Sequence, residues 1–67
     1  MCEASAYIVR RDGREELILE GVDIVEPEEG SGGAIRIVSI FGEQKVLRAR
    51  LKSMSLVNHK IVLEEAG

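Results

Sequence analysis

The chain has 67 residues, a formal net charge of −3 and a single cysteine. This length allows one small domain, which buries only about 60% of the surface that its unfolded chain exposes and often relies on a metal ion or on oligomerisation. One cysteine excludes a disulfide within the chain and favours a reducing compartment. Neither a signal peptide nor an apolar run long enough to cross a membrane is visible, so we expect one cytoplasmic domain over residues 1–67.

Charge is distributed unevenly along the chain. Residues 1–33 carry nine acidic and three basic side chains, whereas residues 34–67 carry three acidic and six basic ones. The acidic total argues against general affinity for nucleic acids or anionic membranes. The asymmetry would allow pairing with a second copy of the chain or docking of an acidic partner, although charged faces often serve only solubility.

Apolar and polar residues alternate with a period of two in the first part of the chain, which is typical of half-buried strands. Residues 4–11 and 14–19 are predicted to form a hairpin around Asp12-Gly13, with a type I′ turn in which both central residues need positive φ. A further strand is predicted over residues 22–26. It should end at Pro27, because proline cannot donate a hydrogen bond to a neighbouring strand.

The second part of the chain continues this pattern. Residues 28–33 predict a long hairpin loop, and the β-branched run at 35–40 predicts a strand, followed by a turn. A single helical turn is expected within residues 53–58, and residues 61–63 should close the sheet. Five or six short antiparallel strands without a long helix indicate an all-β fold, as a small barrel or a sandwich.

Cys2 is the candidate metal ligand, and it directly follows the initiator methionine. If Met1 is removed, the amine and thiolate of Cys2 can close a five-membered ring on an ion; if Met1 stays, its amine can join the Cys2 amide nitrogen and thiolate. One chain supplies too few donors for a closed site, so two chains related by a two-fold axis should share the ion. A planar nitrogen-rich site would favour Ni(II) or Cu(II), and a tetrahedral thiolate site zinc. The alternative is an incidental thiol at a frayed terminus.

The remaining candidate groups carry weaker signals. His59 could ligate a metal or act as a base for Cys2, but its surroundings predict a polar turn residue that leads into the last strand. Met1 and Met54 are possible thioether ligands, and Met54 is expected in the core. There is no phosphate-binding loop, and so small a core leaves little room for a catalytic pocket. We therefore expect no enzymatic activity, and neither catalytic nor cofactor-binding residues.

Basic side chains are expected on the outer face of a strand predicted over residues 45–52, namely Arg48, Arg50 and Lys52. Small barrels that bind RNA combine such residues with aromatic platforms, whereas the aromatic residues here are limited to Tyr7 and Phe41, which we expect in core or turn packing. A small RNA-binding module using this strand is the alternative function. A protein adaptor, with the basic strand docked on an acidic partner, is a third.

Four short segments, in this order and in a chain of this length, resemble the CooT family: residues 1–4 (Met-Cys-Glu-Ala), 19–22 (Leu-Glu-Gly-Val), 38–43 (Val-Ser-Ile-Phe-Gly-Glu) and 59–63 (His-Lys-Ile-Val-Leu). The resemblance implies an SH3-like β-barrel, a homodimer, and binding of Ni(II) through the cysteine after the initiator methionine, here Cys2. It further implies an accessory role, as a metallochaperone, in the maturation of carbon monoxide dehydrogenase. His59 and Met54 are not implied as ligands.

Overall fold

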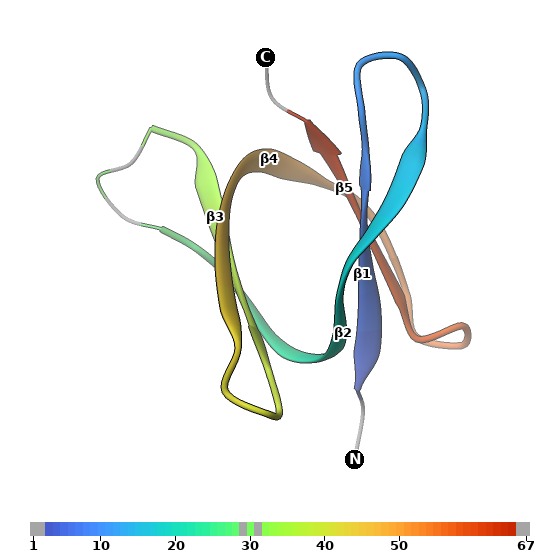
Figure 1. Ribbon diagram of the computed structural model, residues 1–67, viewed down its shortest axis with the longest axis vertical. Coiled ribbons are helices and arrows are strands. Elements are labelled where there is room, and N and C mark those ends of the chain that lie inside the picture. Colours follow the sequence, from blue (N-terminus) through green and yellow to red (C-terminus); the bar gives the residue numbers. More distant parts are fainter. Residues whose placement is uncertain (1–2, 29, 31, 66–67) are drawn as a thin grey trace.

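The protein forms a ring of five strands in a computed structural model that describes residues 3–28, 30 and 32–65. The strands are β1 (Ala4–Val9), β2 (Glu15–Pro27), β3 (Ala34–Ser39), β4 (Gln44–Ser55) and β5 (Lys60–Glu65). Each pairs with the next, and β5 pairs with β1, so the backbone hydrogen bonds run around a closed barrel (Figure 1). The predicted all-β class and small barrel are confirmed. No helix within the described residues is long and apolar enough to span a bilayer.

The pair that closes the ring is parallel. Successive strands pair antiparallel, and with an odd number of them the first and the last run in the same direction. β1 therefore meets β5 in parallel register, from Ser5 opposite Lys60 to Val9 opposite Glu64. As a result, the start of β1 lies beside the start of β5 and the turn that precedes it, while the first and last strands begin and end at opposite ends of the barrel (Figure 1).

The first hairpin lies where it was predicted, but its turn differs from the type I′ expectation. Gly13 has a φ of 92°, whereas His59 is the one non-glycine residue of the described chain with positive φ, so Asp12 is not left-handed. The Gly13 amide donates to the Arg10 carbonyl at 2.9 Å, and the Arg10 amide to the Arg14 carbonyl at 2.7 Å. This is the three-residue loop in which a left-handed glycine follows a tighter turn.

β2 is one continuous strand of 13 residues, where the sequence pattern predicted two. The break in alternation at Gly21 marks a bend, since Gly21 has a φ of 70° and the pairing with β1 shifts register between Ala4 and Ala6. The Gly21 carbonyl accepts a hydrogen bond from the Ile40 amide at 2.8 Å. The bend allows β2 to pair with β1 in its first half and with β3 in its second, and the strand ends at Pro27 as predicted.

Replacing Gly21 with alanine should lower the free energy of unfolding by about 1–3 kcal/mol, because a side chain is strained at this φ. A Cβ at position 21 would also lie 3.2 Å from Phe41 Cε2, so the Phe41 ring would have to move. Gly13→Ala is the matched control: its φ is also positive, but nothing lies within 4 Å of a Cβ there. Urea unfolding of both variants should show the larger loss for Gly21→Ala, and equal losses would contradict this account.

The predicted helical turn within residues 53–58 is wrong. β4 continues to Ser55, which pairs with Lys60, and the chain reverses through Leu56, Val57, Asn58 and His59. Pairing with β5 supplies backbone partners that a single helical turn could not. The Asn58 amide donates to Ser55 Oγ at 3.1 Å, and His59, with a φ of 52°, completes the turn.

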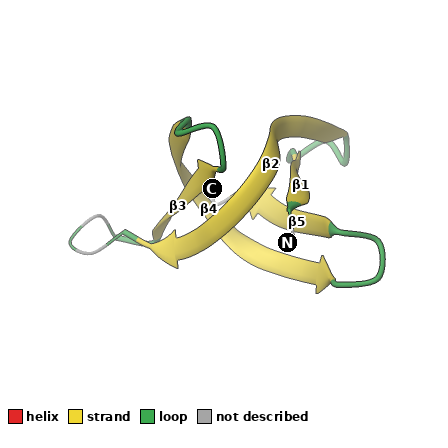
Figure 2. Ribbon diagram, turned by 90° about the horizontal axis from the view of Figure 1, so that it is seen from below, coloured by secondary structure: helices red, strands yellow, loops and turns green. Residues whose placement is uncertain are grey.

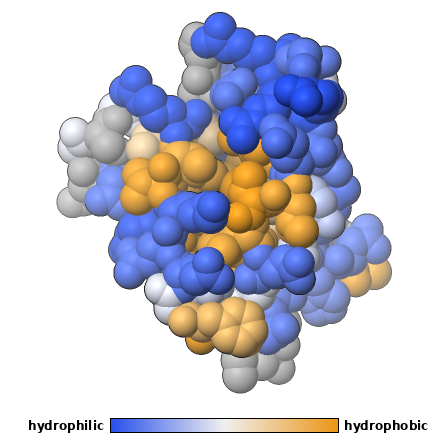
Figure 3. All heavy atoms as spheres, in the orientation of Figure 1, coloured by the Kyte–Doolittle hydropathy of each residue, from blue (hydrophilic) through white to orange (hydrophobic). Residues whose placement is uncertain are grey.

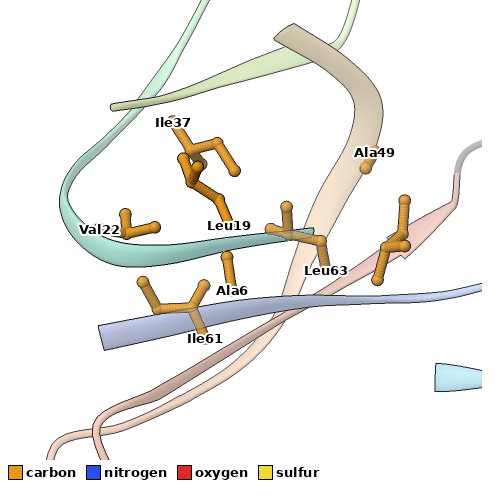
Figure 4. Close-up of a cluster of buried hydrophobic side chains, with 8 residues drawn as sticks. Ala6, Leu19, Val22, Ile37, Ala49, Ile61 and Leu63 are labelled. Carbon is orange, nitrogen blue, oxygen red and sulfur yellow. The ribbon is translucent and has the colours of Figure 1, made fainter. Parts of the chain in front are cut away.

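The core receives side chains from all five strands, including Ala6 and Ile8 of β1, Leu19 and Val22 of β2, Ile37 of β3, Ala49 of β4, and Ile61 and Leu63 of β5. Figure 4 shows these apolar side chains converging inside the ring. Ile37 and Leu63 are fully buried, and the small residues Ala6 and Ala49 allow the strands to approach one another. Ser39 is the buried polar residue of the described chain, and its Oγ accepts hydrogen bonds from the Phe41 and Glu43 amides.

Candidate functional site

The predicted ligand Cys2 lies outside the described residues, together with Met1. The described chain starts at Glu3, at the end of the barrel where β1 begins (Figure 2). The surroundings of the chain start are therefore defined by its neighbours in the fold: β2, the second half of β4, and the turn between β4 and β5.

A surface hollow of about 220 Å³ lies at this end of the barrel, and it is called the N-terminal hollow below. Its apolar lining comes from four strands and the β4–β5 turn: Ala4, Val22, Val25, Met54, Leu56 and Ile61. Polar groups come from Glu3, Asp23, Ser55 and His59. The first two described residues of the chain thus lie in the wall of an apolar hollow with two carboxylates and an imidazole nearby.

His59 occupies the turn before β5, as predicted, and its backbone is tied to the start of β1. The Ser5 amide donates to the His59 carbonyl at 2.9 Å. Met54 is 49% exposed and lines the hollow, so its expected place in the core is wrong. The structure brings both residues close to the chain start, which the sequence had suggested only for His59, as a possible base for Cys2. The strand count explains this proximity. When an odd number of antiparallel strands closes into a ring, the first and last strands run parallel, so the start of β1 lies beside the turn that precedes β5.

The described side chains do not make a metal site by themselves. Within residues 3–28, 30 and 32–65, no group of three or more histidine, cysteine, aspartate or glutamate side chains could hold an ion. Glu3, Asp23 and His59 share the hollow but are not gathered around one point. Any tight site at this end of the barrel therefore needs donors beyond these three side chains.

The basic side chains of the second half of the chain are partly neutralised. Arg50 Nε lies 3.1 Å from Glu64 Oε1, and Arg36 pairs with Glu26 and with Glu28. Lys45, Arg48 and Lys52 form no salt bridge with another described residue. The predicted basic stripe on β4 is thus interrupted at its centre by the Arg50–Glu64 pair.

The two aromatic residues belong to different parts of the barrel, Tyr7 to β1 and Phe41 to the turn between β3 and β4. Lys60 Nζ lies 4.8 Å from the centroid of the Tyr7 ring and 3.0 Å from Glu15 Oε2. Phe41 is 76% exposed, in the turn between β3 and β4, so of the two expected locations, core or turn, it occupies the turn. Tyr7 and Phe41 thus come from separate elements, and the Tyr7 ring is paired with Lys60 rather than with a basic residue of β4, which gives no support to the RNA-binding alternative.

A separate group of charges links the strands at the other end of the barrel. Arg10 Nη1 lies 3.0 Å from Glu65 Oε2, and its Nε donates to Glu16, so β2 and β5 are joined across the end of β1. Hydrogen bonds to Glu16 and then to Glu65 raise the pKa of the Arg10 guanidinium above its usual value. The contact with Glu16 is exposed and that with Glu65 partly buried, and both lie beyond the far end of β1 from the chain start.

Comparisons with known proteins identify relatives of the whole chain. The family model described as "CO dehydrogenase accessory protein CooT" matches residues 1–64. A crystal structure of a protein assigned as CooT from Carboxydothermus hydrogenoformans is similar to this chain, with 45% sequence identity and a TM-score of 0.84. The alignment covers 98% of this chain and 100% of the other. None of the curated proteins matches this chain.

Proposed function

This chain belongs to the CooT family of CO dehydrogenase accessory proteins, and we propose that it is a nickel-binding metallochaperone for the maturation of that enzyme. One Ni(II) ion, the cargo, is bound between two copies of the chain. Each copy contributes the Cys2 thiolate and backbone nitrogen from its amino terminus. The observation that carries this proposal is the placement of the chain's single thiol at residue 2, in a chain that matches the CooT model from its first residue.

The donor chemistry is compatible with nickel. A thiolate and an adjacent nitrogen on each of two chains make a set of two sulfur and at least two nitrogen donors, which suits Ni(II) or Cu(II) in a planar arrangement and zinc in a tetrahedral one. The thiol and the amine must both lose their protons, which costs little near neutral pH because their ordinary pKa values are about 8.5 and about 7.7–8.0. The chain's own role is thus to bind and release an ion, without a chemical step.

The fold supports a site shared between two chains. Cys2 is covalently joined to Glu3, and Glu3 lines the N-terminal hollow. The described side chains around that hollow include no alternative cluster of three metal-binding groups. One amino terminus supplies two or three donors, and the remaining ones are best supplied by the same residues of a second copy.

Extension of the chain at either end provides a direct test. The untagged protein should take up one Ni(II) per two chains, and a short peptide added before Met1 should weaken nickel binding by about 100-fold or more, because it removes the free amine and crowds the shared site. The same peptide added after Gly67 is the matched control, since β5 ends at the opposite end of the barrel (Figure 1). Isothermal titration calorimetry gives the affinity, and native mass spectrometry gives the stoichiometry. Equal affinities for the two extended proteins would refute the proposal.

A further inference from the structure

The first half of β2 has an unpaired edge. Residues 15–20 pair with β1 on one side, and the pairing of β2 with β3 begins only at Val22. Within the described part of the chain, no strand pairs with residues 15–20 on the side away from β1. Such an edge presents backbone N–H and C=O groups with which a further strand can pair. The ring of strands thus closes through the second half of β2 and leaves the first half open to a partner.

The turn between β3 and β4 is fixed beside this edge by hydrogen bonds. The Ile40 amide donates to the Gly21 carbonyl at 2.8 Å, just beyond the end of the unpaired edge. The Oγ of the buried Ser39 accepts from the Phe41 amide at 3.1 Å and from the Glu43 amide at 3.2 Å. The turn therefore has its conformation before any partner arrives, so little conformational entropy is lost when a partner contacts it.

Phe41 extends from this turn with 76% of its surface exposed. The turn does not depend on an aromatic side chain, because backbone groups and the Ser39 hydroxyl make its hydrogen bonds, and turns usually contain polar residues or glycine. Figure 3 shows apolar atoms over this turn and a larger apolar group in the middle of the same face, with polar side chains around them. Exposed aromatic side chains contribute much of the binding energy in many protein interfaces. A contact outside the chain therefore explains Phe41 better than local structure does.

A hollow of about 310 Å³ lies between the unpaired edge and the turn, and it is called the edge hollow below. Its lining comes from the first half of β2, from the turn and from the start of β4: Leu17, Ile18, Leu19, Glu20, Phe41, Glu43 and Lys45. None of these residues lines the N-terminal hollow. The volume is at the lower end of the roughly 300–1,000 Å³ typical of ligand sites, so it suits an inserted side chain.

The chemistry of this surface specifies its occupant. The backbone groups along the edge can be matched over several residues only by another polypeptide in an extended conformation, as in complexes formed by strand addition. Glu20, Glu43 and Lys45 form no salt bridge with another described residue. Two carboxylates and one ammonium group favour a basic side chain over an acidic one in the occupant. The surface thus fits an extended segment that carries an apolar residue and a nearby lysine or arginine.

We propose that the unpaired edge of β2 and the edge hollow bind an extended segment of CO dehydrogenase, the enzyme to which this family is accessory. The segment adds a strand to residues 15–20, packs an apolar side chain against Phe41 and Leu17, and brings a basic side chain to Glu20 and Glu43. This inference rests on the proposed function and deepens it, because it assigns the surface that recognises the enzyme. The edge hollow and the N-terminal hollow share no residue, so the protein can hold its cargo while it is docked.

Substitutions at the edge hollow test this docking surface. Phe41→Ser should weaken binding to purified, nickel-free CO dehydrogenase by about 10-fold or more, and Glu43→Lys should weaken it in the same direction. Val46→Ser is the matched control, since Val46 is 54% exposed on β4 but does not line the edge hollow. Surface plasmon resonance measures the affinities, and circular dichroism with thermal unfolding verifies that each variant keeps the fold.

Hydrogen–deuterium exchange provides a second measurement that does not depend on a substitution. Amides of residues 15–20 that point away from β1 should exchange quickly in the isolated protein, because no strand covers them. With CO dehydrogenase bound, their exchange should slow by about 10-fold or more, whereas the amides of β5, which is paired on both sides, should change little. Unchanged exchange over residues 15–20 in the complex would overturn strand addition at this edge.

The outcomes separate this inference from the nickel proposal. Phe41→Ser should bind Ni(II) as the wild-type protein does, and Cys2→Ser should still bind the enzyme. Equal enzyme affinities in Phe41→Ser and the wild-type protein, or no binding by the wild-type protein, would overturn the docking surface and leave the nickel site standing. Protection of residues 15–20 at high protein concentration without the enzyme would also overturn it, because a second copy would then occupy the edge. Loss of enzyme binding in Phe41→Ser, together with unchanged nickel affinity in Cys2→Ser, would overturn the nickel site alone.

Discussion

Replacing Cys2 with serine should reduce the affinity for Ni(II) by at least about 100-fold, more than the loss caused by disturbing residues that only orient a ligand. A serine hydroxyl keeps the size of the thiol but is not deprotonated near neutral pH, and its oxygen is a poorer ligand than sulfur for this ion. In the shared arrangement the change removes both sulfur donors at once. Isothermal titration with Ni(II), Zn(II) and Co(II) measures the loss and its selectivity.

The matched controls for this prediction are the other soft donors near the chain start. Met54→Leu and His59→Asn alter side chains that line the N-terminal hollow, and asparagine tolerates the left-handed conformation of position 59. Both should bind nickel within a few-fold of the wild-type protein if Cys2 and backbone nitrogens form the site. Nickel binding should also weaken in acid, because protons compete for thiolate and amine. An unchanged affinity in Cys2→Ser, or a collapse in His59→Asn alone, would show that the ligands lie elsewhere.

Replacing Leu63 with alanine should cost about 2–5 kcal/mol of unfolding free energy, the usual range for a buried leucine that leaves a cavity. Leu63 is fully buried in β5, between its neighbours in β1 and β4 (Figure 4). A chain of 67 residues has a total stability of only about 3–10 kcal/mol. This one truncation should therefore remove much of the stability or prevent folding at room temperature.

Leu51→Ala provides the comparison for Leu63→Ala. Leu51 pairs directly with Leu63 across β4 and β5 but is 47% exposed, so its truncation leaves no closed cavity. The expected loss is about 1 kcal/mol or less. Urea unfolding followed by circular dichroism measures both variants, and nickel should raise the midpoint of any variant that still forms the shared site. Similar losses at the two positions would show that the interior of the barrel is not tightly packed around Leu63.

Local chemistry was sufficient to predict most strands and turns. Alternation of apolar and polar residues located β1, β3, most of β4 and half of β5, because the side chains of a strand point to opposite faces in turn. Pro27 marked the end of β2, and the Asp12-Gly13 pair marked the first hairpin. The prediction of two strands around Gly21 was wrong, because a glycine can either end a strand or bend a continuous one, and here it bends β2. Partners in β1 and β3, distant along the chain, decide between the two.

For the candidate site, the sequence identified the ligand, whereas its neighbours in space depended on long-range pairing. The sequence alone singled out Cys2, because a lone thiol behind the initiator methionine needs no fold to be noticed. It placed His59 in a turn and raised a pairing of His59 with Cys2 only as the weaker interpretation, and it put Met54 in the core. That connection arises because β1 and β5 pair across more than 50 intervening residues, between Ser5 and Lys60.

The sequence by itself determined the all-β class, the positions of the first hairpin and of the turn after residue 40, and the identity of the candidate ligand, since each depends on a residue and its near neighbours in the chain. Only the tertiary structure decided that the ring closes, that the closing pair is parallel, and that an apolar hollow lies beside the first residues. The physical reason is that closure depends on hydrogen bonds and packing between distant segments. The favourable free energy of these contacts must exceed the entropic cost of bringing the two ends of the sheet together. Neither quantity can be read from a local sequence pattern.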